Sequence, residues 1–248
     1  MYKNLININL EEYLNKCCGS KTWHEESWLL KLDTFVGTLS KENLNTLRSK
    51  FSITKNSQQT KEKHRQDTNK LNEVMVACAY HPNARFIPEV DGQQTPDLFD
   101  ESLDLQIEVK SLNEGKDEED RHDNQEPNKA EIYINKAISV SELEEKKKAT
   151  ATFFETKKCK YLIDNAISQL KGSGKIYLIY DYNLFSRDNI GSEKEPVYTA
   201  LHPAPLSKEG VKKIIENYCI NFEVAHPSIS IEVIYFGDLR EKIISFSS

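Results

Sequence analysis

The stretch from Leu103 to Lys110 constrains the fold more than any other part of the sequence, because apolar and polar residues alternate along it without a break. The apolar residues are Leu103, Leu105, Ile107 and Val109, and the polar residues are Asp104, Gln106, Glu108 and Lys110. Side chains of a β-strand point to alternate faces of a sheet. We therefore predict a strand over 103–112 whose apolar residues enter a core and whose polar residues share the opposite, open face.

Turn signals upstream of this stretch predict two shorter strands. Asp91-Gly92 is typical of a hairpin turn, so strands are expected over 85–90 and over 96–99. A helix over 67–80 precedes them and ends at His81-Pro82-Asn83. Further along, the pattern predicts helices over 156–170 and 207–222, and strands over 131–138, 176–180 and 229–236. This order of elements predicts an α/β fold in which helices flank a mixed sheet.

The first 60 residues are predicted to form a helical region. Apolar residues recur on one face of a helix at Trp28, Leu32, Phe35 and Leu39. Ser40 is placed to begin a further helix that reaches Phe51. Residues 54–68 are rich in Lys, Gln and Asn, which is typical of a linker. We therefore expect an N-terminal helical appendage over 1–60 and the α/β domain over 61–248.

Composition indicates a soluble globular protein, with 38% hydrophobic and 29% charged residues. No apolar run approaches the roughly 20 residues that span a bilayer, so no membrane partner is expected. The N-terminal segment is too polar for a signal peptide. Five cysteines without a repeating spacing do not suggest a disulfide framework. A reducing, cytoplasmic location is therefore expected.

The net charge of −6 argues against a nucleic-acid partner at first sight, but the charge is unevenly spread. Basic residues outnumber acidic ones over 41–70 and over 146–175, and acidic residues dominate 114–126. Two basic segments could line a groove for a phosphate backbone. The alternative is that each segment is a solvated helix face or loop.

Three residues form a candidate catalytic set. Asp97 follows Pro96 at the start of the predicted second strand, and Glu108 and Lys110 share one face of the third. Two carboxylates on neighbouring strands can hold a divalent metal ion beside an amine that handles protons. That combination suits cleavage of a phosphodiester, whose negative charge must be neutralised before water can attack.

The element order, Pro96-Asp97 and Glu108-Val109-Lys110 together resemble the PD-(D/E)xK nuclease superfamily, the restriction-endonuclease-like fold, over about 67–182. The resemblance implies a Mg²⁺ cofactor, replaceable by Mn²⁺, held by the carboxylates of Asp97 and Glu108 and by the main-chain carbonyl of Val109. It gives Lys110 the task of orienting the attacking water and stabilising developing charge. Beside the metal ion the pKa of Lys110 should fall.

The resemblance adds supporting residues from two helices. Glu73, on the helix before the sheet, matches an acidic residue that could bind a second ion or orient water. Gln169 lies where related nucleases place a polar residue toward the cleft. The Gln-x-x-x-Tyr signature of one subgroup is absent, because residue 173 is Ser. Lysines near the start of the helix over 156–170 could contact phosphates: Lys157, Lys158 and Lys160.

These residues also have ordinary structural readings. Asp97 could simply begin a turn after proline, Glu108 and Lys110 could be an exposed pair, and Glu73 could be an exposed helix position. Asp104 and Gln106, on the same strand face, are interpreted as solvated or supporting. The joint occurrence of the three candidates in the expected elements favours the catalytic interpretation.

The sequence therefore predicts a Mg²⁺-dependent DNA endonuclease, with nucleic acid as its partner. Cutting both strands of a duplex needs two active centres, which a homodimer would supply. No Gly-x-x-x-x-Gly-Lys loop is present, so no nucleotide cofactor is expected. The alternative is a non-catalytic module of the same fold that binds nucleic acid or another protein.

Overall fold

The strands of the protein form one mixed sheet. The computed structural model describes residues 2–10, 27–51, 61–89, 93–112, 158–180 and 208–245. Within these ranges the sheet has the order β1-β2-β3-β4-β5. The strands are β1 (Arg85–Phe86), β2 (Leu98–Asp100), β3 (Leu105–Leu112), β4 (Gly174–Tyr180) and β5 (Ile229–Tyr235). β1, β2 and β3 are antiparallel neighbours, whereas β4 runs parallel to both β3 and β5.

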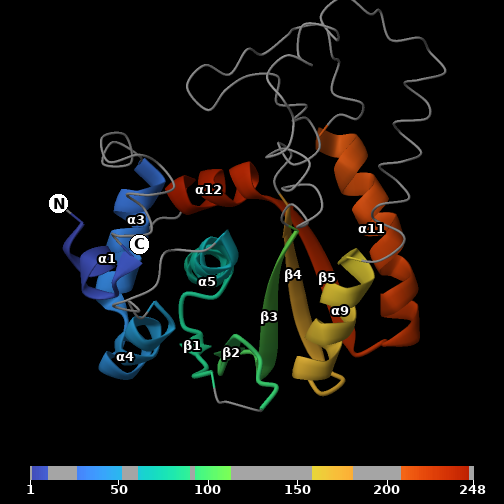
Figure 1. Ribbon diagram of the computed structural model, residues 1–248, viewed down its shortest axis with the longest axis horizontal. Coiled ribbons are helices and arrows are strands. Elements are labelled where there is room, and N and C mark those ends of the chain that lie inside the picture. Colours follow the sequence, from blue (N-terminus) through green and yellow to red (C-terminus); the bar gives the residue numbers. More distant parts are fainter. Residues whose placement is uncertain are drawn as a thin grey trace, which may run out of the picture.

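Helices cover both faces of this sheet (Figure 1). On one face lie α5 (Lys61–Tyr80) and α12 (Phe236–Ser245), and on the other lie α9 (Lys158–Gln169) and α11 (Lys208–Ala225). Alternate residues of β4 divide between the two cores: Tyr177 and Ile179 face α5, whereas Ile176 and Leu178 face α9 and α11. A strand buried on both faces reads as a continuous apolar run, as the segment Ile176–Tyr180 does.

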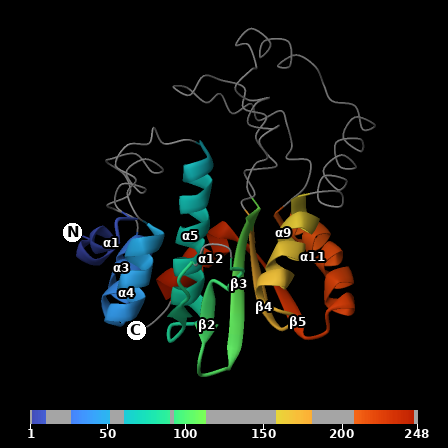
Figure 2. The same ribbon diagram turned by 60° about the horizontal axis from the view of Figure 1, so that its bottom comes forward.

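The N-terminal helices α1 (Lys3–Asn7), α3 (Ser27–Thr38) and α4 (Lys41–Lys50) lie beside α5, on the side away from the sheet (Figures 1 and 2). The Ser40 side chain accepts a hydrogen bond from Asn43 N and caps α4. Apolar residues of these helices belong to the same core as α5 and the sheet. The described part of the 1–60 region therefore shares its core with the rest of the chain, and its status as a separate domain stays a prediction.

Two buried polar networks fix α4 and α5 against the sheet. The side chain of Asn43 in α4 donates to Ala84 O at 3.4 Å and accepts from Phe86 N at 3.0 Å, which ties α4 to β1. At the end of α5, the His81 ring bonds to Asp100 of β2 and to the Tyr177 hydroxyl of β4, both at 2.8 Å. Buried polar groups are costly unless they are hydrogen-bonded, so each network specifies one arrangement of its elements.

Most predicted elements are present, with shifted boundaries. The helix over 67–80 is part of the longer α5, so the predicted linker over 54–68 is wrong from Lys61 onward. The strand over 85–90 is only two residues long as β1, and the strand over 96–99 begins at Leu98 as β2. The turn at Asp91-Gly92, the acidic segment and the strand over 131–138 lie outside the described residues.

Two further expectations are corrected. β3 begins at Leu105, and Leu103 lies in the preceding turn with 62% of its surface exposed instead of in the core. The predicted open face of β3 is covered by α9, and Glu108 is fully buried. The helix α12, which follows β5 directly, was not predicted.

Within the part of the chain that the structure describes, no helix is long and apolar enough to cross a bilayer.

Replacement of Gly174 should test the packing where α9 leads into β4. Gly174 has φ +144°, and an added Cβ would lie 2.5 Å from Gln106 O and 2.9 Å from Leu170 Cδ2. We expect Gly174→Ala to lower the free energy of unfolding by about 3 kcal/mol. Gly172→Ala, at φ +95° with open space around the added Cβ, should cost only about 1 kcal/mol. Denaturant unfolding of both variants measures the difference, and equal costs would contradict the close contact.

Candidate active site

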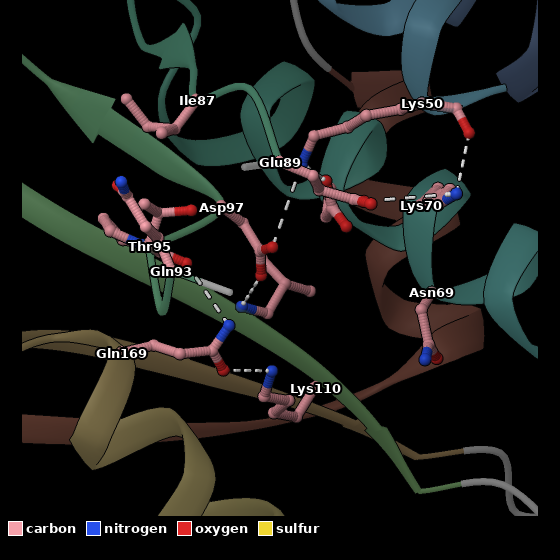
Figure 3. A pocket seen from close by; sticks show the side chains of 13 residues that line it. Lys50, Asn69, Lys70, Ile87, Glu89, Gln93, Thr95, Asp97, Lys110 and Gln169 are labelled. Carbon is pink, nitrogen blue, oxygen red and sulfur yellow. Dashed lines mark hydrogen bonds and ion pairs between the residues drawn. The ribbon is translucent and has the colours of Figure 1, made fainter. Parts of the chain in front are cut away.

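A cavity of about 490 Å³ opens where β2 and β3 face α4, α5 and the end of α9 (Figure 3). Its lining is mostly polar and comes from segments far apart in the sequence: Lys50, Asn69, Lys70, Glu73, Ile87, Glu89, Gln93, Thr95, Pro96, Asp97, Val109, Lys110 and Gln169. All the predicted site residues except Glu108 line it. Glu108 lies directly beneath, hydrogen-bonded to two lining residues.

Asp97 and Glu108 are brought together by the antiparallel pairing of β2 with β3. Asp97 N donates to Glu108 Oε2 at 3.2 Å, and Val109 N donates to Asp97 Oδ2 at 2.8 Å. The main chain adds a ladder bond from Asp97 N to Ile107 O at 3.1 Å. Each carboxylate is therefore held by the backbone beside the other one. The two side chains lie close together as predicted, although Asp97 directly precedes β2 instead of lying on it.

Lys110 is fixed by a chain of polar contacts across the cavity. Its Nζ donates to Glu108 Oε1 and, at 2.7 Å, to Gln169 Oε1. The Gln169 side-chain amide in turn donates to Thr95 O at 3.2 Å. Gln169 is the last residue of α9, so the helix end, β3 and the segment before β2 meet at this ammonium (Figure 3).

Glu73 meets a lysine that the sequence did not single out. Lys50 Nζ, from the end of α4, donates to Glu73 Oε2 at 2.5 Å and lies 3.9 Å from Asp97 Oδ1. Both side chains are almost fully buried, with 3% of Lys50 and 6% of Glu73 exposed. Lys70, which also lines the cavity, donates to Lys50 O at 2.7 Å. Glu73 is therefore not the exposed helix position that its local sequence also allowed.

Acidic side chains outnumber lysines at the centre of the cavity. Among the described residues, three carboxyl groups meet two ammonium groups at its centre: Glu73, Asp97 and Glu108 with Lys50 and Lys110. Burial and the nearby Asp97 carboxylate raise the pKa of Glu73 to about 8 and that of Glu108 to about 9. Loss of hydration on burial is the larger cause of both shifts, and repulsion by the Asp97 carboxylate adds to it.

The lysines respond in the opposite sense. Burial alone would lower the pKa of Lys110, but the carboxylates of Glu108 and Asp97 outweigh it and raise that pKa above its ordinary value. Burial would also lower the pKa of Lys50, but the carboxylates of Glu73 and Asp97 outweigh this effect and raise that pKa. Both side chains are therefore ammonium ions at neutral pH. The fall in the Lys110 pKa beside a metal ion stays a prediction.

The donor set fits a hard divalent cation such as Mg²⁺. Mg²⁺ favours one or two carboxylates and completes its shell with water and substrate phosphate oxygens. Asp97 and Glu108 provide such a pair. Burial and the Asp97 carboxylate raise the pKa of Glu108, and a bound cation would favour its ionised form. Across the described ranges, no cluster of three or more His, Cys, Asp or Glu side chains could hold a metal ion. The arrangement thus offers a two-carboxylate site and no all-protein cage.

Other predicted residues lie elsewhere. Asp104 is exposed in the turn before β3. Gln106 lies on β3, and its buried Oε1 has no hydrogen-bond partner among the described residues. Lys160 is exposed and pairs with Asp164 on α9, away from the cavity lining. Lys157 and the side chain of Lys158 lie outside the described residues.

Sequence reasoning missed Lys50 and Lys70 as individual site residues. Both belong to the basic segment over 41–70, for which a groove lining and a solvated face were left as alternatives, and both line the cavity. In the sequence, Lys50 precedes the apolar Phe51 at the end of a predicted helix. This position does not distinguish a buried lysine from an exposed one. Their place in the site depends on the packing of α4 against α5.

Comparison with models of known protein families, with curated proteins and with solved structures yields no match. The conclusions about function therefore depend on the residues and their geometry.

The raised pKa values of Glu73 and Glu108 predict how stability depends on pH in a chelating buffer. A carboxyl with a raised folded-state pKa binds more protons folded than unfolded, so its stabilising effect is complete below about pH 4.5 and is lost as pH rises through about 8 to 9. We expect the free energy of unfolding to fall over this range. Glu108→Gln should flatten the slope, and exposed Glu101→Gln should leave it unchanged. A native slope that rises with pH would contradict the shifts.

Proposed function

We propose that the chain is a Mg²⁺-dependent DNA endonuclease of the PD-(D/E)xK type, with a restriction-endonuclease-like fold over its α/β part. The observation that carries the proposal is the junction of Asp97, Glu108 and Lys110 at one cavity, with the two carboxylates held side by side and the ammonium next to them. The order helix, three antiparallel strands, helix and parallel strand supports the resemblance.

The residues that would hold Mg²⁺ are Asp97 and Glu108, with the carbonyl of Val109 as the third ligand that the resemblance implies. When bound, such an ion would neutralise charge on the phosphate and lower the pKa of a bound water, so that hydroxide is available to attack the phosphorus. Glu108 gains access to such an ion if Lys110 moves from it toward the cavity. The Lys110 side chain borders the cavity, with 18% of its surface exposed.

Lys110 would then act on the reacting atoms as a positive hydrogen-bond donor. Its ammonium carries three N–H groups and no acceptor, so it can orient a water oxygen and bind the negative charge that grows on the phosphate. The Gln169 carbonyl oxygen keeps this ammonium at the cavity, and the Gln169 amide is anchored on Thr95 O. Gln169 is in this scheme a positioning residue.

Cleavage of supercoiled plasmid with Mg²⁺ tests the proposal directly. The native chain should nick or linearise the DNA, and Asp97→Ala or Lys110→Ala should reduce the rate at least about 100-fold, because each removes a charge from the reacting centre. Asp104→Asn removes an exposed negative charge four residues before Glu108 and six before Lys110, and Asn tolerates the positive φ of this position, so this variant should cleave like the native chain. Binding of DNA without cleavage of any DNA or RNA would favour the non-catalytic module.

The positioning role of Gln169 predicts a separate effect. Gln169→Ala should lower the cleavage rate about 10- to 100-fold because Lys110 loses one of its two side-chain partners. Binding of DNA in Ca²⁺, measured by gel shift, should change little. Ser168→Ala is the matched control, since its hydroxyl bonds only within α9 to Asp164 O. Unchanged cleavage by Gln169→Ala would remove the residue from the mechanism.

A further inference from the structure

Lys50 differs from Lys110 in a way that suggests a distinct task. Both ammonium groups bind a buried carboxylate, but the Lys110 side chain has 18% of its surface exposed at the cavity and that of Lys50 only 3%. Lys50 Nζ lies between two acids from different elements, 2.5 Å from Glu73 Oε2 on α5 and 3.9 Å from Asp97 Oδ1 before β2. A cation between two carboxylates is the arrangement that a bound metal ion would also adopt.

The framework around Lys50 holds it in this place. α4 is capped by Ser40 and tied to β1 by the Asn43 side chain, with bonds to Ala84 O and Phe86 N. Arg48 Nε donates to Asn7 O at 2.8 Å, and Lys70 Nζ donates to the carbonyl of Lys50 itself. These bonds fix the backbone position of Lys50, and its side chain, with 3% of its surface exposed, is buried against Glu73.

We propose that Lys50 is a built-in cation that occupies the second cation position of the active site, between Glu73 and Asp97, so that the chain binds a single divalent ion beside Glu108. The proposal rests on the nuclease function proposed above and specifies how its metal site is limited. Glu73 is then a partner of Lys50 and not a metal ligand. The N-terminal helix α4 becomes part of the active site through this one side chain.

Charge balance supports this assignment. A second divalent ion next to the ammonium of Lys50 would be repelled at short range, in a site where burial weakens screening. The single ammonium already neutralises part of the charge of Glu73 and Asp97. Asp97 is thus shared, with Oδ1 toward Lys50 and Oδ2 accepting from Val109 N on the Glu108 side.

Counting bound Mn²⁺ on the 248-residue chain tests the proposal without relying on cleavage. Mn²⁺ is titrated into the protein, and the free ion is measured by electron paramagnetic resonance. The difference should correspond to about one bound ion per native chain, because one two-carboxylate site is open to the ion. Lys50→Met removes the charge at similar length and should raise the number to about two, because Glu73 and Asp97 are then free to bind an ion. Lys50→Gln, which keeps a hydrogen-bond donor for Glu73, should do the same.

Matched variants separate this effect from a general disturbance of the cavity. Lys70→Met removes another cavity-lining ammonium, one that bonds to Lys50 O and lies 4.0 Å from Glu89, and should leave the count at about one. Lys50→Arg keeps the charge and should also leave it at one. Lys50→Met combined with Glu73→Gln should return the count to one, since the second carboxylate is lost.

The outcomes distinguish the two proposals. Two Mn²⁺ ions on the native chain, or one ion on folded Lys50→Met and Lys50→Gln, would overturn the role of Lys50 while leaving the nuclease function intact. Circular dichroism shows whether Lys50→Met and Lys50→Gln fold. If neither folds, the numbers of ions bound by the native chain and by Lys50→Arg still test the proposal, because two ions on either chain would overturn it. A native chain that binds one ion but cleaves no nucleic acid would overturn the proposed function alone.

Discussion

The buried carboxylate of Glu108 is the constraint on which the site depends. A carboxylate removed from water costs several kcal/mol unless opposite charge and hydrogen bonds compensate it. Glu108 has no exposed surface, and its compensation comes from Lys110 on the same strand and from the backbone of Asp97 on the neighbouring one. The pairing of β2 with β3 is therefore both a structural element and the means by which two acids come into contact.

A second buried ion pair connects the N-terminal helices to the site in the same way. Lys50 and Glu73 join α4 to α5, and their proximity to Asp97 couples that pair to the first one. Removal of either partner alone would leave an uncompensated buried charge, the costly case for an ion pair. The N-terminal helices and the sheet consequently depend on one another electrostatically as well as through their shared apolar core.

Local patterns were sufficient to predict the strands that form the middle of the sheet. The run Ile176–Tyr180 and the alternation through Val109 are properties of a few consecutive residues, and periodicity reports them directly. The same is true of the capped helix after Ser40. Glu108 and Lys110 could be chosen because their spacing on a predicted strand puts both on one face, and Asp97 because Pro96-Asp97 precedes that strand as the resemblance implies.

The failures arise where tertiary packing decides. The polar segment at the start of α5 lacks an apolar face, and helix over 61–68 continues from the buried part of the same helix. Leu103 completes the alternation but lies in a turn in which Asp104 has positive φ, so it leaves the core. The burial of Lys50 depends on contacts with Glu73, 23 residues away, which no local pattern encodes.

The position of α12 has a consequence for how the chain acquires its structure. This helix, near the end of the sequence, packs against both α3 and α5, and the rings of Phe236 and Trp28 meet edge to face with centroids 6.4 Å apart. During synthesis the early helices leave the ribosome long before this partner exists, and contacts between distant segments are slow to form. Trp28 and its neighbours therefore lack part of their packing until α12 has been synthesised, about 200 residues later in the sequence.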